Sequence, residues 1–313
     1  MLVEGLLFIA VGVVGLLLPL SAGYRARLVD RLGDQARLEV PGRYREAFEM
    51  RETRRMRAGG VGIILTGLVI IGLSLAGVER GTLDGWVLFS LMVVLGTMCL
   101  AAVEIWWPSA PVDGPRAARM TSPGLGDYLP PLVRRGYAVL VAVGFALTAG
   151  ALLLGLSGWF DQGTLWRSPL PLVLVALPVL TGLTWVAVRR ILDAPQPARD
   201  ETELYWQDVI RSSTLASLLV PTAVVALLGV LAVGLALDYA ASVAAAEIGV
   251  GPSWTAALLV AGYVLPIALV AVLLVLTAGR FGGTEVAHMR DRLWGGQVPA
   301  DRAQVGNRHE DRS

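Results

Sequence analysis

The chain has 313 residues, of which 55% are hydrophobic and only 16% are charged, and its mean hydropathy is +0.64. This composition excludes a soluble globular domain, and the near balance of 26 basic against 25 acidic residues, with so many apolar ones, excludes a disordered chain. The single cysteine excludes an internal disulfide and a cysteine-based metal centre, and two histidines in the polar C-terminal part disfavour a haem between helices. The composition therefore predicts an all-α, polytopic integral membrane protein.

Seven apolar stretches are long enough to cross a membrane, because a hydrocarbon core of about 30 Å needs a helix of roughly 20 residues. In chain order they lie at residues 2–20, 60–78, 86–107, 136–158, 169–188, 215–237 and 254–278. We expect residues 1–295 to form a single transmembrane helix bundle and the polar tail, 296–313, to be disordered. A six-span bundle with one re-entrant run is the alternative.

The distribution of arginine predicts the orientation, since every basic residue of the chain is an arginine. Of the 26 arginines, 24 lie in the connections after the first, third and fifth spans or in the C-terminal tail, while Arg80 and Arg167 lie on the other side. Because cytoplasmic connections are rich in basic residues, this pattern places the N-terminus outside and the C-terminus inside. It predicts a multi-pass protein of the cell membrane, with anionic lipid headgroups at its cytoplasmic face and a membrane protein as possible partners.

The largest predicted cytoplasmic segment is the arginine-rich loop 21–59, which Pro41-Gly42 divides. Its second part, residues 43–52, has the pattern of a charged helix that runs into the second span, with two aromatic residues four positions apart on one face. The stretches 200–210 and 284–294 have the spacing of amphipathic helices and are expected to lie along the inner membrane surface. The candidate surface for a partner or for lipid consists of Tyr44, Phe48, Tyr205, Trp206 and Trp294.

Few polar or helix-breaking residues fall inside the predicted spans. An ionisable residue there is either functional or hydrated near the interface, and a proline either exposes carbonyl groups around a substrate or bends an ordinary membrane helix. Prolines are expected to break spans five, six and seven. The candidate intramembrane polar or hinge positions are Glu104, Pro178, Pro221, Tyr263 and Pro266.

A weak internal sequence repeat relates two parts of the chain. Gly62 and Thr66 recur as Gly144 and Thr148, at the same offset that aligns two short Gly-Thr-Leu connections. Either spans two and three duplicate spans four and five, or the match reflects chance in glycine- and leucine-rich helices.

No motif for catalysis, a metal or a cofactor occurs: there is no His-Glu-x-x-His, no Gly-x-Ser-x-Gly and no pair of membrane-level aspartates. The acidic residues at 200, 201, 203 and 208 fit the first turns of a helix, and six acids interleaved in the loop 21–59 argue against nucleic acid. We therefore expect a protein that is not an enzyme, has no cofactor, and serves as an accessory or scaffold component of a membrane complex. The alternative is a carrier or channel for a small or apolar solute through the proline-containing spans five to seven.

Overall fold

The computed structural model describes residues 2–76, 91–92, 94–96, 98–100, 102–103, 123–156, 170–196, 198, 200–248 and 284–299. Within these ranges the chain is helical apart from short turns and connections, and it contains no β-strand. The predicted all-α class is confirmed.

The helices follow one another along the chain with short connections. They are α1 (Leu2–Leu17), extended by the 3-10 turn η1 (Leu18–Leu20), α2 (Ala22–Ala36), α3 (Gly42–Leu75), α5 (Leu125–Tyr128), α6 (Pro131–Gly155), α8 (Leu170–Asp193), α9 (Glu201–Ile248) and α11 (Thr284–Trp294).

Five helical segments are long and apolar enough to cross a membrane, which indicates a membrane protein. These segments are Leu2–Leu20, Tyr44–Leu75, Pro131–Gly155, Leu170–Asp193 and Glu201–Leu237, and they contain or overlap five of the seven predicted spans. The predicted span 86–107 is described only in part, and both 254–278 and the predicted tail beyond Pro299 lie outside the described residues.

Two helices each join a charged or amphipathic stretch to an apolar span. The charged stretch 43–52 and the second span form the single helix α3, as the pattern predicted, and the amphipathic stretch 200–210 is continuous with the sixth span in α9. No proline lies between the charged and the apolar part of either helix, so nothing interrupts the backbone hydrogen bonds. The stretch 200–210 is therefore not a separate amphipathic helix but the first part of a helix that is long and apolar enough to cross a membrane.

Local capping explains where several of these helices begin and end. Proline residues precede α3 and α6, where the missing backbone N–H has no helical partner to lose. The side chain of Asp200 accepts a hydrogen bond from the backbone N–H of Glu203 at 2.8 Å and so caps the start of α9. Arg37 ends α2 in the left-handed conformation, with φ of 54°.

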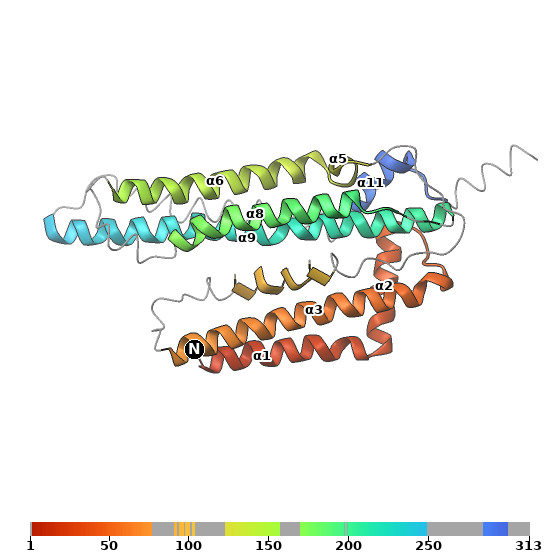
Figure 1. The fold of residues 1–313 in the computed structure, drawn as a ribbon, viewed down its shortest axis with the longest axis horizontal. Coiled ribbons are helices and arrows are strands. Elements are labelled where there is room, and N and C mark those ends of the chain that lie inside the picture. The colour runs from red at the N-terminus through yellow and green to blue at the C-terminus, as the bar shows by residue number, and fades with distance from the viewer. Residues whose placement is uncertain are drawn as a thin grey trace, which may run out of the picture.

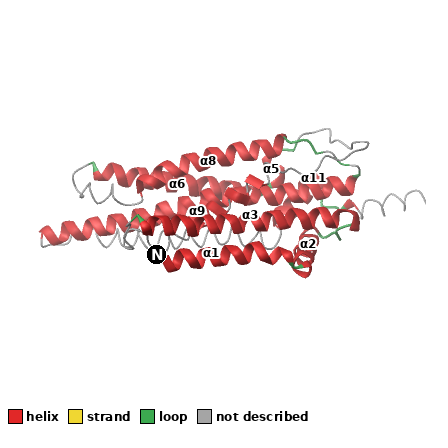
Figure 2. Cartoon of the chain, turned by 60° about the horizontal axis from the view of Figure 1, so that its bottom comes forward, coloured by secondary structure: helices red, strands yellow, loops and turns green. Residues whose placement is uncertain are grey.

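The long helices lie side by side in two groups, with α6, α8 and α9 in one and α1 with α3 in the other (Figure 1). At one end, α2 crosses the helix direction, and α5 and α11 lie near it (Figures 1 and 2). We call this end the head: α2, α5, α11 and the ends of α3, α8 and α9 that pack against them. One continuous apolar core fills it.

Glycine residues allow α1 and α3 to approach each other closely. Gly5 and Gly12 on α1 meet Gly67 and Gly60 on α3, one heptad apart on both helices. A Cβ atom added at Gly67 would lie 2.6 Å from the carbonyl oxygen of Gly5, and one at Gly60 would lie 2.9 Å from that of Gly12. Such small-residue contacts hold membrane helices together by van der Waals packing, because lipid supplies no hydrophobic driving force between them.

Val94 and Gly96 link the two groups of helices. A Cβ atom at Gly62 of α3 would lie 2.5 Å from the Cα atom of Gly96, while Val94 packs on the core that α6, α8 and α9 share. Within that core, Gly144 of α6 lies against Ala226 of α9.

The two copies of the internal sequence repeat share one local hydrogen bond. The hydroxyl groups of Thr66 and Thr148 are buried and donate to the carbonyl oxygens of Gly62 and Gly144, at 2.9 and 2.7 Å. The nearest neighbours of these glycines differ, however: for Gly62 they are Leu95 and Gly96, which follow α3, whereas for Gly144 the nearest neighbour is Ala226 of α9.

Candidate functional site

The five aromatic residues that the sequence singled out come together in the head. The ring of Phe48 on α3 lies 6.3 Å from that of Tyr44 and 5.4 Å from that of Trp206 on α9. Tyr205 lies 6.3 Å from Trp206 and 5.3 Å from Trp294 on α11, in edge-to-face contacts. The cluster therefore joins α3, α9 and α11.

Three of these five side chains lie in the interior of the head. Tyr205, Trp206 and Trp294 are 0, 1 and 3% exposed, and Tyr44 and Phe48 are partly buried against the same core. The expectation of a surface for a partner or for lipid is therefore wrong for Tyr205, Trp206 and Trp294, and it stays a prediction for Tyr44 and Phe48. The stretch 284–294 forms α11 as predicted, but its apolar stripe packs into the head and not on the membrane.

A buried carboxylate, Asp208, lies at the centre of the head. It is 0% exposed and accepts three hydrogen bonds, from the hydroxyl of Tyr128 at 3.0 Å, the amide of Gln196 at 3.0 Å and the indole N–H of Trp294 at 2.9 Å. Burial and the negative charge of Asp208 raise the pKa of Tyr128, so that its hydroxyl stays protonated and can donate. One side chain of α9 thus binds α5, the α8–α9 connection and α11.

Further polar contacts hold α11 and α2 against the other parts of the head. The hydroxyl of Tyr205 donates to the carbonyl oxygen of Ala36 at 2.7 Å, at the end of α2. On α11, a ring nitrogen of His288 lies 3.0 Å from the carbonyl oxygen of Gly126, and Arg292 lies 3.5 Å from Asp127. The head is therefore held together by residues from distant parts of the chain.

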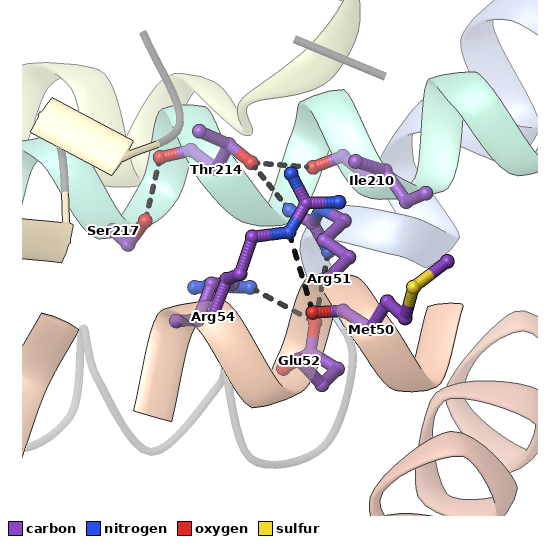
Figure 3. A network of polar contacts seen from close by, with 8 residues as sticks. Met50, Arg51, Glu52, Arg54, Ile210, Thr214 and Ser217 are labelled. Atoms are coloured by element: carbon purple, nitrogen blue, oxygen red, sulfur yellow. Dashed lines mark hydrogen bonds and ion pairs between the residues drawn. The ribbon is translucent and has the colours of Figure 1, made fainter. Parts of the chain in front are cut away.

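A polar network joins α3 to α9 where the head meets the apolar helices (Figure 3). The guanidinium of Arg51 donates to the hydroxyl of Thr214 at 3.0 Å and forms an ion pair with Glu52 at 2.8 Å. Thr214 in turn donates to the carbonyl oxygen of Ile210, and Ser217 donates to that of Thr214 (Figure 3). These contacts connect the two helix groups on the membrane side of the aromatic cluster.

An open hollow of about 430 Å³ lies in the outer part of the head, at the turn between α2 and α3. The ion pair between Arg45 and Asp30, 2.7 Å long, forms part of its wall, and the exposed side chains of Asp34, Arg37 and Glu39 complete its charged lining. Both signs of charge therefore face solvent around one concave surface.

The intramembrane proline residues lie inside continuous helices. Pro178 is within α8 and Pro221 within α9, so spans five and six are not broken there. A hydroxyl group lies near Pro178: that of Thr181 donates to the carbonyl oxygen of Leu177 at 2.7 Å, which is not the carbonyl that the proline leaves without a donor, that of Leu174.

A cluster of hydroxyl groups lies beside these prolines, between α6, α8 and α9. Thr184 and Thr222 are hydrogen-bonded at 3.1 Å, and the hydroxyl of Tyr137 lies next to Thr181, Thr184 and Thr222. The other candidate intramembrane residues, Glu104, Tyr263 and Pro266, lie outside the described residues.

The sequence reasoning missed the central role of Asp208, which it grouped with the acidic first turns of α9. A signal was available, because Asp208 lies beyond the first turn of α9 and shares a helix face with Tyr205 and Ser212. Its partners Tyr128 and Gln196 carry no such signal. In the part of the chain that the structure describes, no three His, Cys, Asp or Glu side chains group as metal ligands.

Comparisons with known proteins give no match to this chain, whether with protein-family models, with curated proteins or with solved structures.

Proposed function

We propose that this chain is a non-catalytic accessory component of a membrane complex, which holds a partner protein at its head. The hollow at the α2–α3 turn carries the proposal, because it places charges of both signs on an open concave surface outside the apolar helices. Exposed charges at such a surface favour specific pairing with a complementary protein surface.

The construction of the head supports this proposal. The helices α3 and α9 run from the apolar region into the head without interruption, and Arg51 and Thr214 connect them. The buried hydrogen bonds of Asp208 and the aromatic cluster make the head one packed unit. A partner at the hollow would therefore be held at a fixed position relative to the membrane.

The proposal includes the topology that the arginine distribution predicts: seven spans in the cell membrane, an outer N-terminus and a cytoplasmic head. The described helices agree with it in one respect. The arginines of α2, α3 and α11, together with those at the ends of α6 and α8 nearest the head, all belong to one end of the molecule.

Co-purification tests the proposed role. The tagged full-length chain is extracted from its own membrane in native nanodiscs, and the proteins that elute with it are quantified by mass spectrometry. We expect a stoichiometric protein partner with the wild-type chain, and at least a tenfold loss of that partner with Arg37→Glu, which reverses a charge in the hollow.

The matched control is Arg27→Glu, which makes the same charge change at an exposed position of α2 outside the hollow. It should retain the partner. Equal loss from both variants, or elution of the wild-type chain without any protein, contradicts the proposal.

A carrier or channel for a small solute is the second candidate, and the hydroxyl cluster between α6, α8 and α9 favours it. Hydroxyl groups inside a bundle can replace the water around a polar solute, and Thr222 is fully buried there. Elution of the chain with a defined small molecule, and no protein, would support this candidate over the first.

A further inference from the structure

Four arginines lie at the head end of two neighbouring helices in the α6–α8–α9 group. Arg134 and Arg135 are in the first turn of α6, and Arg189 and Arg190 are in the last turns of α8. The two helices pack against each other and run in opposite directions, so these positions lie at the same end of the molecule (Figure 1).

Two of these arginines continue apolar stripes that are exposed on the outside of the bundle. Arg135 follows Leu132 and precedes Val139 on one face of α6, and both apolar side chains are more than half exposed. On α8, Arg190 lies on the same face as Val186, which is 63% exposed. Exposed apolar side chains on a membrane helix contact lipid tails, so the arginines lie where those tails meet the headgroups.

A tryptophan orients the third guanidinium. The guanidinium carbon of Arg189 lies 4.7 Å from the ring centre of Trp185, one turn earlier in α8, and Trp185 is 54% exposed. Tryptophan favours the interface of a membrane, and the cation–π contact holds the charged group above the ring, at headgroup level.

These arginines differ in their partners from four arginines of α2 and α3. In the head, Arg25 pairs with Glu49, Arg45 with Asp30, and both Arg51 and Arg55 with Glu52. Among the described residues, by contrast, no carboxylate forms an ion pair with any of the four arginines of α6 and α8, not even Asp193 at the end of α8. The Nε atom of Arg134 is moreover buried without a hydrogen-bond partner in the described part of the chain.

We propose that the head end of α6 and α8 is a binding site for the phosphate headgroup of an anionic phospholipid. Guanidinium groups bind phosphate oxygens through paired N–H donors, and the exposed stripes below them match the acyl chains of the same molecule. The site goes beyond the accessory role proposed above and does not depend on it.

Thermal stability in defined lipid tests the site. The purified full-length chain is placed in nanodiscs of phosphatidylcholine alone or of phosphatidylcholine with phosphatidylglycerol, and bound lipid is counted by native mass spectrometry. We expect a higher Tm and retained phosphatidylglycerol for the wild-type chain. The triple variant Arg135→Gln, Arg189→Gln, Arg190→Gln should bind phosphatidylglycerol at least about tenfold more weakly, because each arginine near the surface contributes on the order of a factor of five.

A second triple variant controls for net charge. Arg302→Gln, Arg308→Gln and Arg312→Gln remove the same charge from the polar C-terminal end of the sequence, and this variant should retain the lipid. Equal loss from both triple variants, or equal Tm with and without phosphatidylglycerol, overturns the proposal. So does an equal rise of Tm with inorganic phosphate alone, which would identify a soluble anion as the ligand. Should the first triple variant not fold, the single variant Arg190→Gln must still lower lipid retention.

Discussion

Replacing Asp208 by alanine is expected to lower the free energy of unfolding by about 3–5 kcal/mol. The reason is that Tyr128, Gln196 and Trp294 all donate to this carboxylate, and the substitution leaves their donors buried without an acceptor. Each buried donor that loses its partner costs about 1–3 kcal/mol. The thermal unfolding of the purified chain in nanodiscs measures the effect as a fall in Tm.

Two further variants separate the loss of hydrogen bonds from a general loss of folding. Asp34→Ala removes an exposed carboxylate and should change stability by less than about 0.5 kcal/mol. Trp294→Phe keeps most of the buried ring and removes one donor, so it should fold and yet release α11, which brief trypsin treatment detects as faster cleavage after the buried Arg290. If Asp208→Ala is as stable as Asp34→Ala, the carboxylate does not hold the head together.

Adding one methyl group to α3 at Gly67 is expected to separate α3 from α1. The new Cβ atom would lie 2.6 Å from the carbonyl oxygen of Gly5 and 2.7 Å from a side-chain carbon of Ile9, so the helices must move apart. Overpacking of this kind costs about 1–3 kcal/mol. Gly67→Ala should therefore lower the Tm of the chain in nanodiscs.

The same helix provides the control. Gly72 is exposed, and a Cβ atom there would meet nothing within 4 Å. Because alanine is a better helix former than glycine, Gly72→Ala should leave the Tm unchanged or raise it slightly. An equal response of the two variants would show that α1 and α3 are not in close glycine contact.

Hydropathy predicted the long helices well, because a helix that contacts lipid must be apolar on its exposed side. The helices α1, α6 and α8 have many exposed apolar residues, among them Val3, Leu153 and Leu172, and their predicted spans agree with the structure within a few residues at most ends. The division of the first loop at Pro41-Gly42 was also predicted correctly, since α3 begins there.

Periodicity could not show what covers an amphipathic face. The spacing of Tyr205, Trp206 and Trp294 predicted helices with an apolar face, and those helices exist. Whether such a face meets lipid, a partner or the same chain depends on contacts between distant segments, which periodicity does not record. The donors of Asp208 come from three separate segments for the same reason, so only the folded chain reveals that they meet.

The orientation of the head is the central premise of the proposed role, because a partner and the predicted arginine bias both require it to face the cytoplasm. Cysteine labelling on intact cells tests it most directly. In a Cys99→Ala background, Asp34→Cys introduces a thiol at the hollow, and Thr164→Cys introduces one in a connection that the sequence places outside.

A membrane-impermeant maleimide should label the Thr164→Cys chain in intact cells and the Asp34→Cys chain only after permeabilisation. Labelling of Asp34→Cys in intact cells, with Thr164→Cys protected, would place the head outside and contradict the account.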